Sequence, residues 1–588
     1  MVSNVLLPYL KQSAVCRKGA TQSEPMTGMG NGDILAQVPV YPEDLADPVD
    51  GSCADGGSFA KPVEKGAWNS FLQQVLSFPA MLGTLLIGII FVAKRGFDVD
   101  PDFWWHLKIG EGILATHRWP TVDPYSFTAA GQPWMACEWL GDVLFATVER
   151  AWGLRGLDAL LMVMSAAIIV ALYTLCAIRS GNSKASFVTT VALLVMALPV
   201  LTMRPQMLGY LFLILTLIAL ERFRKGHRTA LWFLPALFLV WINAHGSWVL
   251  GIGTLFVYWA SGLKEFHVGG IQTRVWAPAE RVRLSFVILL CLAVLSITPY
   301  GTELAAYPFQ VASSLPVNMA SINEWQPMPF NLVGGKVFLV MVLGLFAIQI
   351  AFELTWRLEE LALLFFGTLM AFLHVRFILV FVPFFAPLLA TVLARWVPGY
   401  ERKKDLYLAN AVLMLATIAG IVAYFPSQAK IQESITSHFP VRAIAFLREH
   451  PVPGPVFNSY WFGGYLIWNG GAESRVFIDG RGELYEVGGV FSDYMHIMRA
   501  QPGALSVLSN YGVQACLLDR NEPLVNFLAV LPEWRRVYID DNSALFVRRN
   551  STDAAGAKPV PGKQVAENEP KNSRLDTKAQ GSNGYAHD

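Results

Sequence analysis

Apolar runs recur between residues 77 and 425, and they constrain the fold more than any other feature of this sequence. A helix needs roughly 20 consecutive apolar residues to cross the hydrocarbon core of a bilayer. Only 15% of the residues are charged, against roughly 25% in soluble domains. The sequence therefore predicts an α-helical polytopic membrane protein with about eleven transmembrane helices. The runs are 77–93, 156–178, 185–201, 205–221, 229–244, 247–263, 284–298, 336–354, 359–374, 377–395 and 405–425.

Both ends of the chain are polar. Residues 1–70 and 551–588 contain no long apolar run, and we expect them to form disordered tails. No secretory signal segment opens the sequence, so the run at 77–93 is expected to be an uncleaved anchor. The six cysteines lie far apart without a CxxC pair. This spacing predicts neither a disulfide framework nor a zinc site.

The segment 138–153 decides the topology, because it is amphipathic and carries four charged residues. If it lies flat at the interface, the basic loops 179–184, 222–228, 274–283 and 395–404 all fall on the side of the N-terminal tail. That arrangement satisfies the positive-inside rule, and a spanning segment would violate it. We therefore expect a transmembrane domain over 71–428 with a cytoplasmic N-terminus. Its first exterior loop, 94–154, would carry interfacial helices.

Residues 429–550 differ in character from the apolar part. Short β-rich runs alternate there with helical stretches, as in "VPGPVFNSYWFGGYLIW" and "RVFIDGRGELY". This pattern predicts one small α/β or α+β domain, which the topology puts on the extracytoplasmic side. Asp479, Arg481 and Glu483 would lie near the outer face, where we expect the domain to tune acceptor choice rather than perform chemistry.

The first exterior loop begins with an unusual cluster, "DVDPDFWWHL" at 98–107. Trp105, Ile109 and Ile113 recur at helical spacing, which predicts a helix on the membrane surface with Asp102 at its N-cap. Asp is a common cap and Trp is common at membrane interfaces, so an ordinary helix start also explains these residues.

Other ionisable residues are expected at the same face, at or near the outer ends of spans. An ionisable group at membrane depth is a functional-site hypothesis by default. Two ordinary alternatives stay open: the arginines could be snorkelling anchors, and His245 could be a satisfied interfacial histidine. The residues concerned are Arg204, Glu324 and Arg376, with His106, Glu138, His245 and His374 as further candidates.

A carboxylate beside cations at lipid depth suits a reaction on a phosphate-bearing lipid. The cations would neutralise a leaving phosphate, and the carboxylate would remove a proton from an incoming hydroxyl. A transport path would instead place polar groups near mid-membrane. The sequence contains no Walker A, HExxH or GxSxG motif, and a net charge of +1 gives no basis for binding nucleic acid.

Three motifs follow one another after the first apolar run: "DPDFWWHLKIGEGIL", "RWPTVDPYSF" and "GQPWMACEWL". In this order they resemble the GT-C superfamily of polytopic glycosyltransferases, in particular lipid A aminoarabinose transferases and rhizobial lipopolysaccharide glycosyltransferases. The resemblance covers roughly 77–430. It implies a polyprenyl-phosphate-linked sugar donor, an acceptor hydroxyl on a lipid, glycan or protein, and an active face on the exterior of a bacterial inner membrane.

The resemblance also implies roles for particular residues. Asp102 would be the general base or lie beside a divalent cation, Mg²⁺ or Mn²⁺, with Asp100 as second choice and Asp98 as third. Where relatives carry an "EKPP"-like turn, this chain has "MACEWL", so the phosphate-binding Lys is missing. Arg204 or Arg376 would have to replace it. A non-catalytic envelope scaffold, and less readily a lipid or solute transporter, remain alternative functions.

Overall fold

The computed structural model describes residues 64–94, 100–314, 316–352, 354–452, 454–471 and 474–549. Most of the two predicted tails therefore lies outside the described residues, as does Asp98. The described chain forms two compact units. Residues up to 81 together with 402–413 form one, while 82–401 and the residues from 414 onward form the other. All candidate site residues belong to the second unit. The predicted domain boundaries at 70, 428 and 550 stay predictions.

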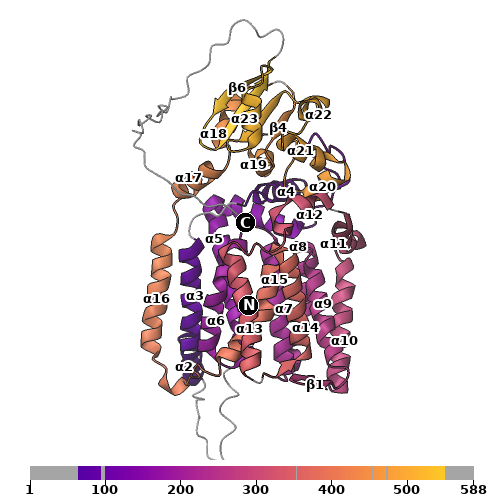
Figure 1. Cartoon of the computed structure of the whole chain (residues 1–588). Helices are drawn as coiled ribbons and strands as arrows, with labels where there is room; N and C mark the ends of the chain where they lie inside the picture. Colours follow the sequence, from indigo (N-terminus) through magenta and orange to yellow (C-terminus); the bar gives the residue numbers. More distant parts are fainter. Residues whose placement is uncertain are drawn as a thin grey trace, which may run out of the picture. The chain divides into compact units, whose positions relative to one another are not determined.

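Every apolar run coincides with a helix (Figure 1). Within the described residues, six helices are long and apolar enough to cross a membrane, or seven if a bent pair counts as one span. The prediction of a helical membrane protein is confirmed, whereas eleven spans are not reached by this criterion because several helices are shorter than 18 residues. The helices are α3 (Phe78–Lys94), α5 (Trp139–Ser180), α6 (Ser183–Ala197), α7 (Gln206–Arg224), α8 (Leu234–Ala244), α9 (Trp248–Ser261), α10 (Pro278–Ala293), α13 (Val333–Ala351), α14 (Leu358–Leu373), α15 (Ile378–Leu393) and α16 (Tyr407–Tyr424).

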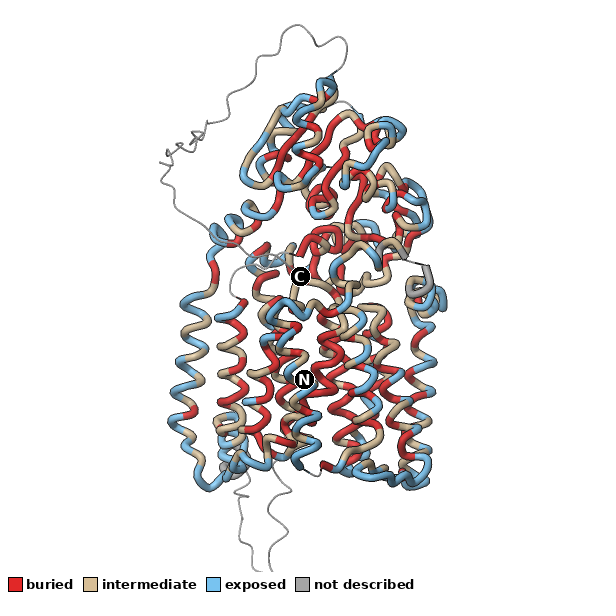
Figure 2. The backbone as a smooth tube through the Cα atoms, in the orientation of Figure 1, coloured by how far each residue is buried: buried red, intermediate tan, exposed pale blue. Residues whose placement is uncertain are grey.

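The bundle packs most tightly around α5, α7 and α15, and α15 is buried over most of its length (Figure 2). Shorter elements connect the long helices. These are α2 (Glu64–Val75), α11 (Thr302–Ser314), α12 (Pro316–Ser321), and the 3₁₀ turns η1 (Leu198–Val200), η2 (Arg228–Leu231), η3 (Val294–Ser296), η4 (Asn323–Trp325), η5 (Val375–Phe377) and η6 (Arg402–Lys404). A small sheet of order β1-β2-β3 joins β1 (His267–Val268), β2 (Ile271–Gln272) and β3 (Trp356–Arg357).

The segment 138–153 forms a helix of its own, as the sequence suggested. It makes up the first part of α5, and a kink at Gly153, whose φ of 61° and ψ of −162° are non-helical, separates it from the following span. That it lies flat at the membrane interface stays a prediction. Asp142 and Phe145 are fully buried because the preceding helix, α4 (Phe103–Thr116), packs against this part. Gly110 permits that approach, since a Cβ there would overlap the carbonyl oxygen of Asp142.

Helix α4 begins directly after Asp102, as predicted, and most of its side chains between Phe103 and Ile109 are buried in the protein. The indole of Trp104 is fully buried, and its ring centroid lies 5.5, 4.9 and 4.6 Å from those of Phe439, Tyr465 and Trp468. Trp105 is only 9% exposed. The two tryptophans are therefore core residues rather than lipid anchors, because elements from the end of the chain cover the helix.

Those covering elements surround a mixed four-stranded sheet of order β4-β5-β7-β6, in which β4 pairs with β5 in parallel and the other pairs are antiparallel. The loop before α5 is attached to this part of the chain, since Ser126 and Val476 form a parallel bridge. The strands are β4 (Val456–Asn458), β5 (Ala515–Asp519), β6 (Trp534–Ile539) and β7 (Ser543–Arg548). The helices are α17 (Gln428–His438), α18 (Val441–Glu449), α19 (Tyr460–Asn469), α20 (Gly482–Val487), α21 (Val490–Met498), α22 (Ala504–Asn510) and α23 (Pro523–Ala529).

Candidate active site

One guanidinium gathers three carboxylates at the start of α4. Arg204, which precedes α7, lies 2.6 Å from Asp100 Oδ2 through Nε, 2.9 Å from Asp102 Oδ2 through Nη2, and 2.9 Å from Glu324 Oε1 through Nη1. Thr202 adds a hydroxyl that donates to Asp100 Oδ2 at 3.0 Å. We call Asp100, Asp102, Arg204 and Glu324 the arginine cluster. Its acids outnumber its cation three to one, so the cluster can hold a proton.

Asp102 occupies the N-cap position of α4, yet its side chain makes no cap hydrogen bond. Its backbone N–H donates to Asp100 Oδ1 at 3.0 Å, and its own carboxylate is directed to Arg204. Burial raises the pKa of Asp102 to about 7, although the charge of Arg204 opposes this shift. Helix capping therefore does not explain this carboxylate, and its pKa suits a group that exchanges protons near neutral pH.

The end of the chain covers Asp102 directly. A Cβ at Gly480 would overlap Asp102 Oδ1 and lie 2.7 Å from its Cγ. A Cβ at Gly464, in α19, would likewise overlap the carbonyl oxygen of Pro101. Only glycine lets the two backbones approach Asp102 this closely, so the segment following β4 is part of the site. The sequence predicted that this region tunes acceptor choice, and it did not predict a contact with Asp102.

Arg481 fixes the covering segment in place. Its fully buried guanidinium lies 2.8 Å from Asp123 Oδ1 in the first exterior loop and 2.7 Å from Asp479 Oδ2. Its Cζ atom also lies 4.8 Å from the centre of the Trp134 ring. Breaking a buried pair of this kind typically costs about 3–5 kcal/mol. The position of Gly480 over Asp102 is therefore firmly held.

A second group of titratable side chains surrounds Glu138, which immediately precedes α5. His245 Nε2 lies 3.1 Å from Glu138 Oε1, and His106 Nε2 lies 3.4 Å from Glu138 Oε2. The other nitrogen of His106, Nδ1, lies 2.7 Å from Asp142 Oδ1. We call Glu138, His106, His245 and Asp142 the histidine cluster. Its members come from three separate regions of the chain, between α4 and α9.

The charge states of the histidine cluster follow from its burial. Burial lowers the pKa of His245 to about 3 and that of His106 well below its usual value, with Arg204 acting in the same direction on both. Both imidazoles are therefore neutral at pH 7. Burial and the nearby Glu483 raise the pKa of Glu138 to about 8, while Arg204 and Arg376 oppose that rise.

Arg376 lies in η5 and presents a cation of a different kind. Its guanidinium carbon lies 4.2 Å from the centre of the Trp325 ring, and within the described ranges it makes no ion pair with a carboxylate. His374 Nδ1 lies 2.6 Å from the carbonyl oxygen of Trp325, which holds the Trp325 backbone in place. The guanidinium of Arg376 is thus stacked on Trp325, and no carboxylate among the described residues pairs with it.

The residues do not fit a divalent cation. Among the described parts of the chain, no group of three or more His, Cys, Asp or Glu side chains is arranged to hold a metal ion. Asp100, Asp102 and Glu324 each direct an oxygen to Arg204. The guanidinium therefore occupies the position between the acids that a metal would need.

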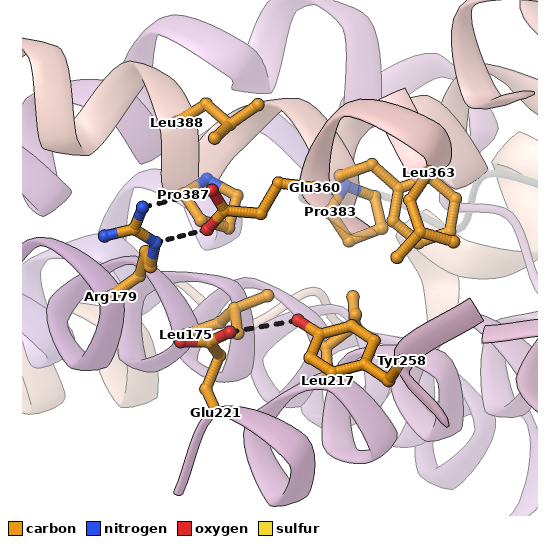
Figure 3. Close-up of a pocket in the computed structure, with 11 residues that line it drawn as sticks. Leu175, Arg179, Leu217, Glu221, Tyr258, Glu360, Leu363, Pro383, Pro387 and Leu388 are labelled. Atoms are coloured by element: carbon orange, nitrogen blue, oxygen red, sulfur yellow. Dashed lines mark hydrogen bonds and ion pairs between the residues drawn. The ribbon is translucent and has the colours of Figure 1, made fainter. Parts of the chain in front are cut away.

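A further charged group lies at the other end of α7, roughly 28 Å away because that helix has 19 residues. Figure 3 shows Arg179 paired with Glu360, at 3.1 Å for Nη2, and Tyr258 donating to Glu221 at 2.9 Å. A small cavity lies among these side chains and the leucines and prolines around them. Each of the two glutamates has a partner, so this group joins helices rather than offering a reactive charge.

All nine site residues predicted from the sequence lie at one end of the helices, as ion-pair contacts and electrostatic coupling show. The arginine cluster unites Asp100, Asp102, Arg204 and Glu324, and the histidine cluster unites His106, Glu138 and His245. His374 and Arg376 flank Trp325. The charges of Asp102, Arg204 and Arg376 all act on Glu138, which couples the groups.

Sequence reasoning missed the role of Asp142 in the site and the approach of Gly480. Asp142 is one of the four charged residues of the amphipathic segment 138–153, and that pattern alone does not indicate a contact with His106. The one sequence signal for Gly480 is the "DGRG" turn, whose two glycines flank a basic residue. Nothing in that turn indicates which residue it would contact.

The fold and the site define an integral membrane protein with a buried ionic site at the ends of its helices. No family model and no curated protein matches the sequence. The structure is similar to the oligosaccharyltransferase AglB from Archaeoglobus fulgidus in complex with an inhibitory peptide and a dolichol-phosphate. The sequence identity is 12%, the match covers 74% of this chain and 69% of that chain, and the TM-score is 0.46.

Two other solved structures are similar in the same way. ArnT from Cupriavidus metallidurans, bound to undecaprenyl phosphate, is 14% identical over 84% of this chain and 100% of that chain, with a TM-score of 0.42. The mycobacterial arabinofuranosyltransferase AftD is 13% identical over 79% of this chain and 39% of that chain, with a TM-score of 0.45. With TM-scores below 0.5, the function proposed below rests on the residues of the site.

Proposed function

We propose that this chain is a membrane glycosyltransferase that moves a sugar from a polyprenyl-phosphate-linked donor to an acceptor hydroxyl of the cell envelope. The observation that carries the proposal is the position of Asp102. Its carboxylate is held by Arg204, covered by Gly480 and given a pKa of about 7, and it lies at the ends of membrane-spanning helices. A proton acceptor at that depth suits a substrate whose reactive group is carried on a lipid.

In this proposal Asp102 is the general base. Asp102 removes the proton of the acceptor hydroxyl while the acceptor oxygen forms a bond to the anomeric carbon. The bond from that carbon to the phosphate oxygen breaks, and its electron pair leaves with the lipid phosphate. Arg204 orients the base, since its Nη2 lies 2.9 Å from Asp102 Oδ2, the carboxylate oxygen that does not take the proton. A positioned base of this kind typically contributes 10²- to 10⁴-fold in rate.

Arg376 is the better of the two predicted arginines for binding the donor phosphate. Arg204 is surrounded by three carboxylates, so an additional anion would be repelled by Asp100, Asp102 and Glu324. Arg376 faces an aromatic ring and acts with Arg204 on the same histidine, His245. We therefore assign the phosphate to Arg376, and the orientation of the acids to Arg204.

Replacing Arg376 by methionine should raise the KM for the donor by roughly 10- to 100-fold. A charge-assisted hydrogen bond contributes about 1.5–3 kcal/mol, and each 1.4 kcal/mol is about tenfold in binding. The matched control is Arg155→Met, which also removes a guanidinium stacked on an aromatic ring, 5.5 Å from the centre of Phe425. Steady-state transfer rates at varied donor concentration measure the effect. An unchanged KM in Arg376→Met would assign this arginine to packing on Trp325.

The membrane setting is part of the proposal. We place the site on the exterior face of a bacterial inner membrane, because the basic loops then lie on the cytoplasmic side. Comparing envelope glycans by mass between cells with the protein, without it, and with Asp102→Asn tests the function. The expected result is a sugar-sized mass loss in the last two. Glycans that change only when the whole protein is absent would indicate a non-catalytic scaffold.

A further inference from the structure

The histidine cluster has no role in the proton transfer to Asp102. Its hydrogen bonds fix the orientation of its side chains. The backbone N–H of Ser247 donates to His245 Nδ1 at 3.0 Å. That nitrogen therefore carries no proton, and in the neutral imidazole the proton lies on Nε2. Nε2 in turn donates to Glu138 Oε1 at 3.1 Å. His245 thus fixes one oxygen of Glu138 in a defined orientation.

The other oxygen of Glu138 faces His106. The separation from Oε2 to Nε2, 3.4 Å, is long for a hydrogen bond, whereas Nδ1 of the same ring lies 2.7 Å from Asp142 Oδ1. An imidazole held tightly by an acid on one side can exchange a proton on the other, as in Asp–His pairs of known enzymes. The Glu138 side chain is 18% exposed, so it is not sealed off from a ligand.

Charge balance requires that acids in this region hold protons. Six carboxylic acids lie at or around the two clusters: Asp100, Asp102, Glu138, Asp142, Glu324 and Glu483. Arg204 and Arg376 are the cations acting on Glu138, and its two histidines are neutral. Burial raises the pKa of four of these acids, Asp102, Glu138, Asp142 and Glu483, so these four are not all ionised beside the two cations. An arriving phosphate adds negative charge, so it favours the protonated form of a nearby acid still further.

We propose that Glu138 is the proton donor to the leaving phosphate, held by His245 and supported by His106 and Asp142. This inference rests on the proposed function. As the bond from the sugar to the phosphate oxygen breaks, that oxygen receives the electron pair and takes the proton of Glu138. Asp102 meanwhile takes the proton of the acceptor hydroxyl. In each transfer Asp102 gains one proton and Glu138 loses one. The starting state returns when a proton passes from Asp102 to Glu138, directly or through water.

This assignment predicts a bell-shaped dependence of transfer on pH. The base must be ionised, so activity should rise with pH through the pKa of Asp102, about 7. The acid must be protonated, so activity should fall as pH rises through the pKa of Glu138, about 8. Glu483, Asp102, Arg204 and Arg376 all act on Glu138, and the two apparent values therefore belong to the coupled site.

The test compares Glu138→Gln and Glu138→Asp with wild type across pH. Glu138→Gln should lose about 10²-fold or more in transfer, together with the fall at high pH, whereas Glu138→Asp should recover part of both. The infrared spectrum of wild type near neutral pH should contain a protonated-carboxyl band that is lost in Glu138→Gln, seen in the difference between the two spectra because other acids of the site also hold protons. Glu111→Gln, in α4 and outside both clusters, is the control for both measurements, since an amide oxygen there can still accept from Trp468 Nε1 at 3.1 Å.

The outcomes separate the two proposals. A wild-type protein that transfers no sugar contradicts the proposed function, and the infrared band still reports whether Glu138 is protonated. An active wild type whose pH profile is unchanged in Glu138→Gln contradicts the role of Glu138 and leaves the function intact. If Glu138→Gln does not fold, a wild type without the infrared band near neutral pH overturns the inference by itself.

Discussion

Replacing Gly480 by alanine should reduce sugar transfer by about 10²-fold or more while leaving the helices intact. The new Cβ would overlap Asp102 Oδ1 and lie 2.9 Å from Trp105 Nε1. The segment cannot readily lift away, because Arg481 ties it to Asp123, in the loop before α5, at 2.8 Å. The Asp102 side chain must therefore rotate out of its ion pair. A misplacement of 1 Å at a reacting group can cost about 10²-fold in rate.

The control for this prediction lies a few residues further along. Gly488 ends α20 with an ordinary φ of −88°, and a Cβ there would make a normal contact, 3.7 Å from Val490 Cγ2. Gly488→Ala should therefore keep wild-type transfer. Initial rates of transfer and the thermal stability of the extracted protein distinguish the variants. A fully active Gly480→Ala would mean that the segment does not cover the base in the working protein.

The helices could be predicted from the sequence because length and apolar character are local properties. The surroundings of α4 could not. Trp104 reads equally well as a lipid anchor or a core residue, and its partners Phe439, Tyr465 and Trp468 follow more than 300 positions later. Nothing in residues 98–116 indicates that a later segment will cover them. Tryptophans that anchor the helix in lipid were therefore the natural expectation, and the long-range packing overturned it, because both tryptophans are buried.

The candidate site shows the same division. Arg204, Glu324 and Arg376 could be grouped from the sequence because each was expected at the same face of the membrane. Their pairing could not be deduced: Arg204 was expected to bind phosphate, but it is surrounded by acids. Which acids share one guanidinium depends on loop conformations of a few ångströms. The alternation of membrane spans predicts on which face of the membrane a residue lies, but it does not predict the distances between residues on that face.

Asp102→Asn should lower transfer by at least about 10²-fold with little change in donor affinity. The amide is nearly isosteric, and its oxygen can still accept from Arg204 Nη2, which lies 2.9 Å from Oδ2. Helix α4 should survive, since the Asp102 side chain makes no cap hydrogen bond. What disappears is the proton acceptor, a group typically worth 10²- to 10⁴-fold in rate. Loss of rate without loss of folding would therefore report on the chemistry alone.

Asp100 is the rival base, and its contacts predict a milder effect. Its Oδ1 accepts from the backbone of Asp102, and its Oδ2 accepts from Thr202 and pairs with Arg204. Both oxygens are thus engaged in holding the cluster together. Asp100→Asn should lower stability and transfer moderately, because an amide can replace only some of these interactions.

The most direct measurement is the initial rate of sugar transfer from a polyprenyl-phosphate-linked donor, for wild type, Asp102→Asn, Asp100→Asn and Glu111→Gln in matched membrane preparations. We expect wild type and Glu111→Gln to be alike, Asp100→Asn to be partly active, and Asp102→Asn to fall by at least about 10²-fold. An active Asp102→Asn beside an inactive Asp100→Asn would move the base to Asp100. Full activity in both variants would contradict the account and remove the arginine cluster from the chemistry.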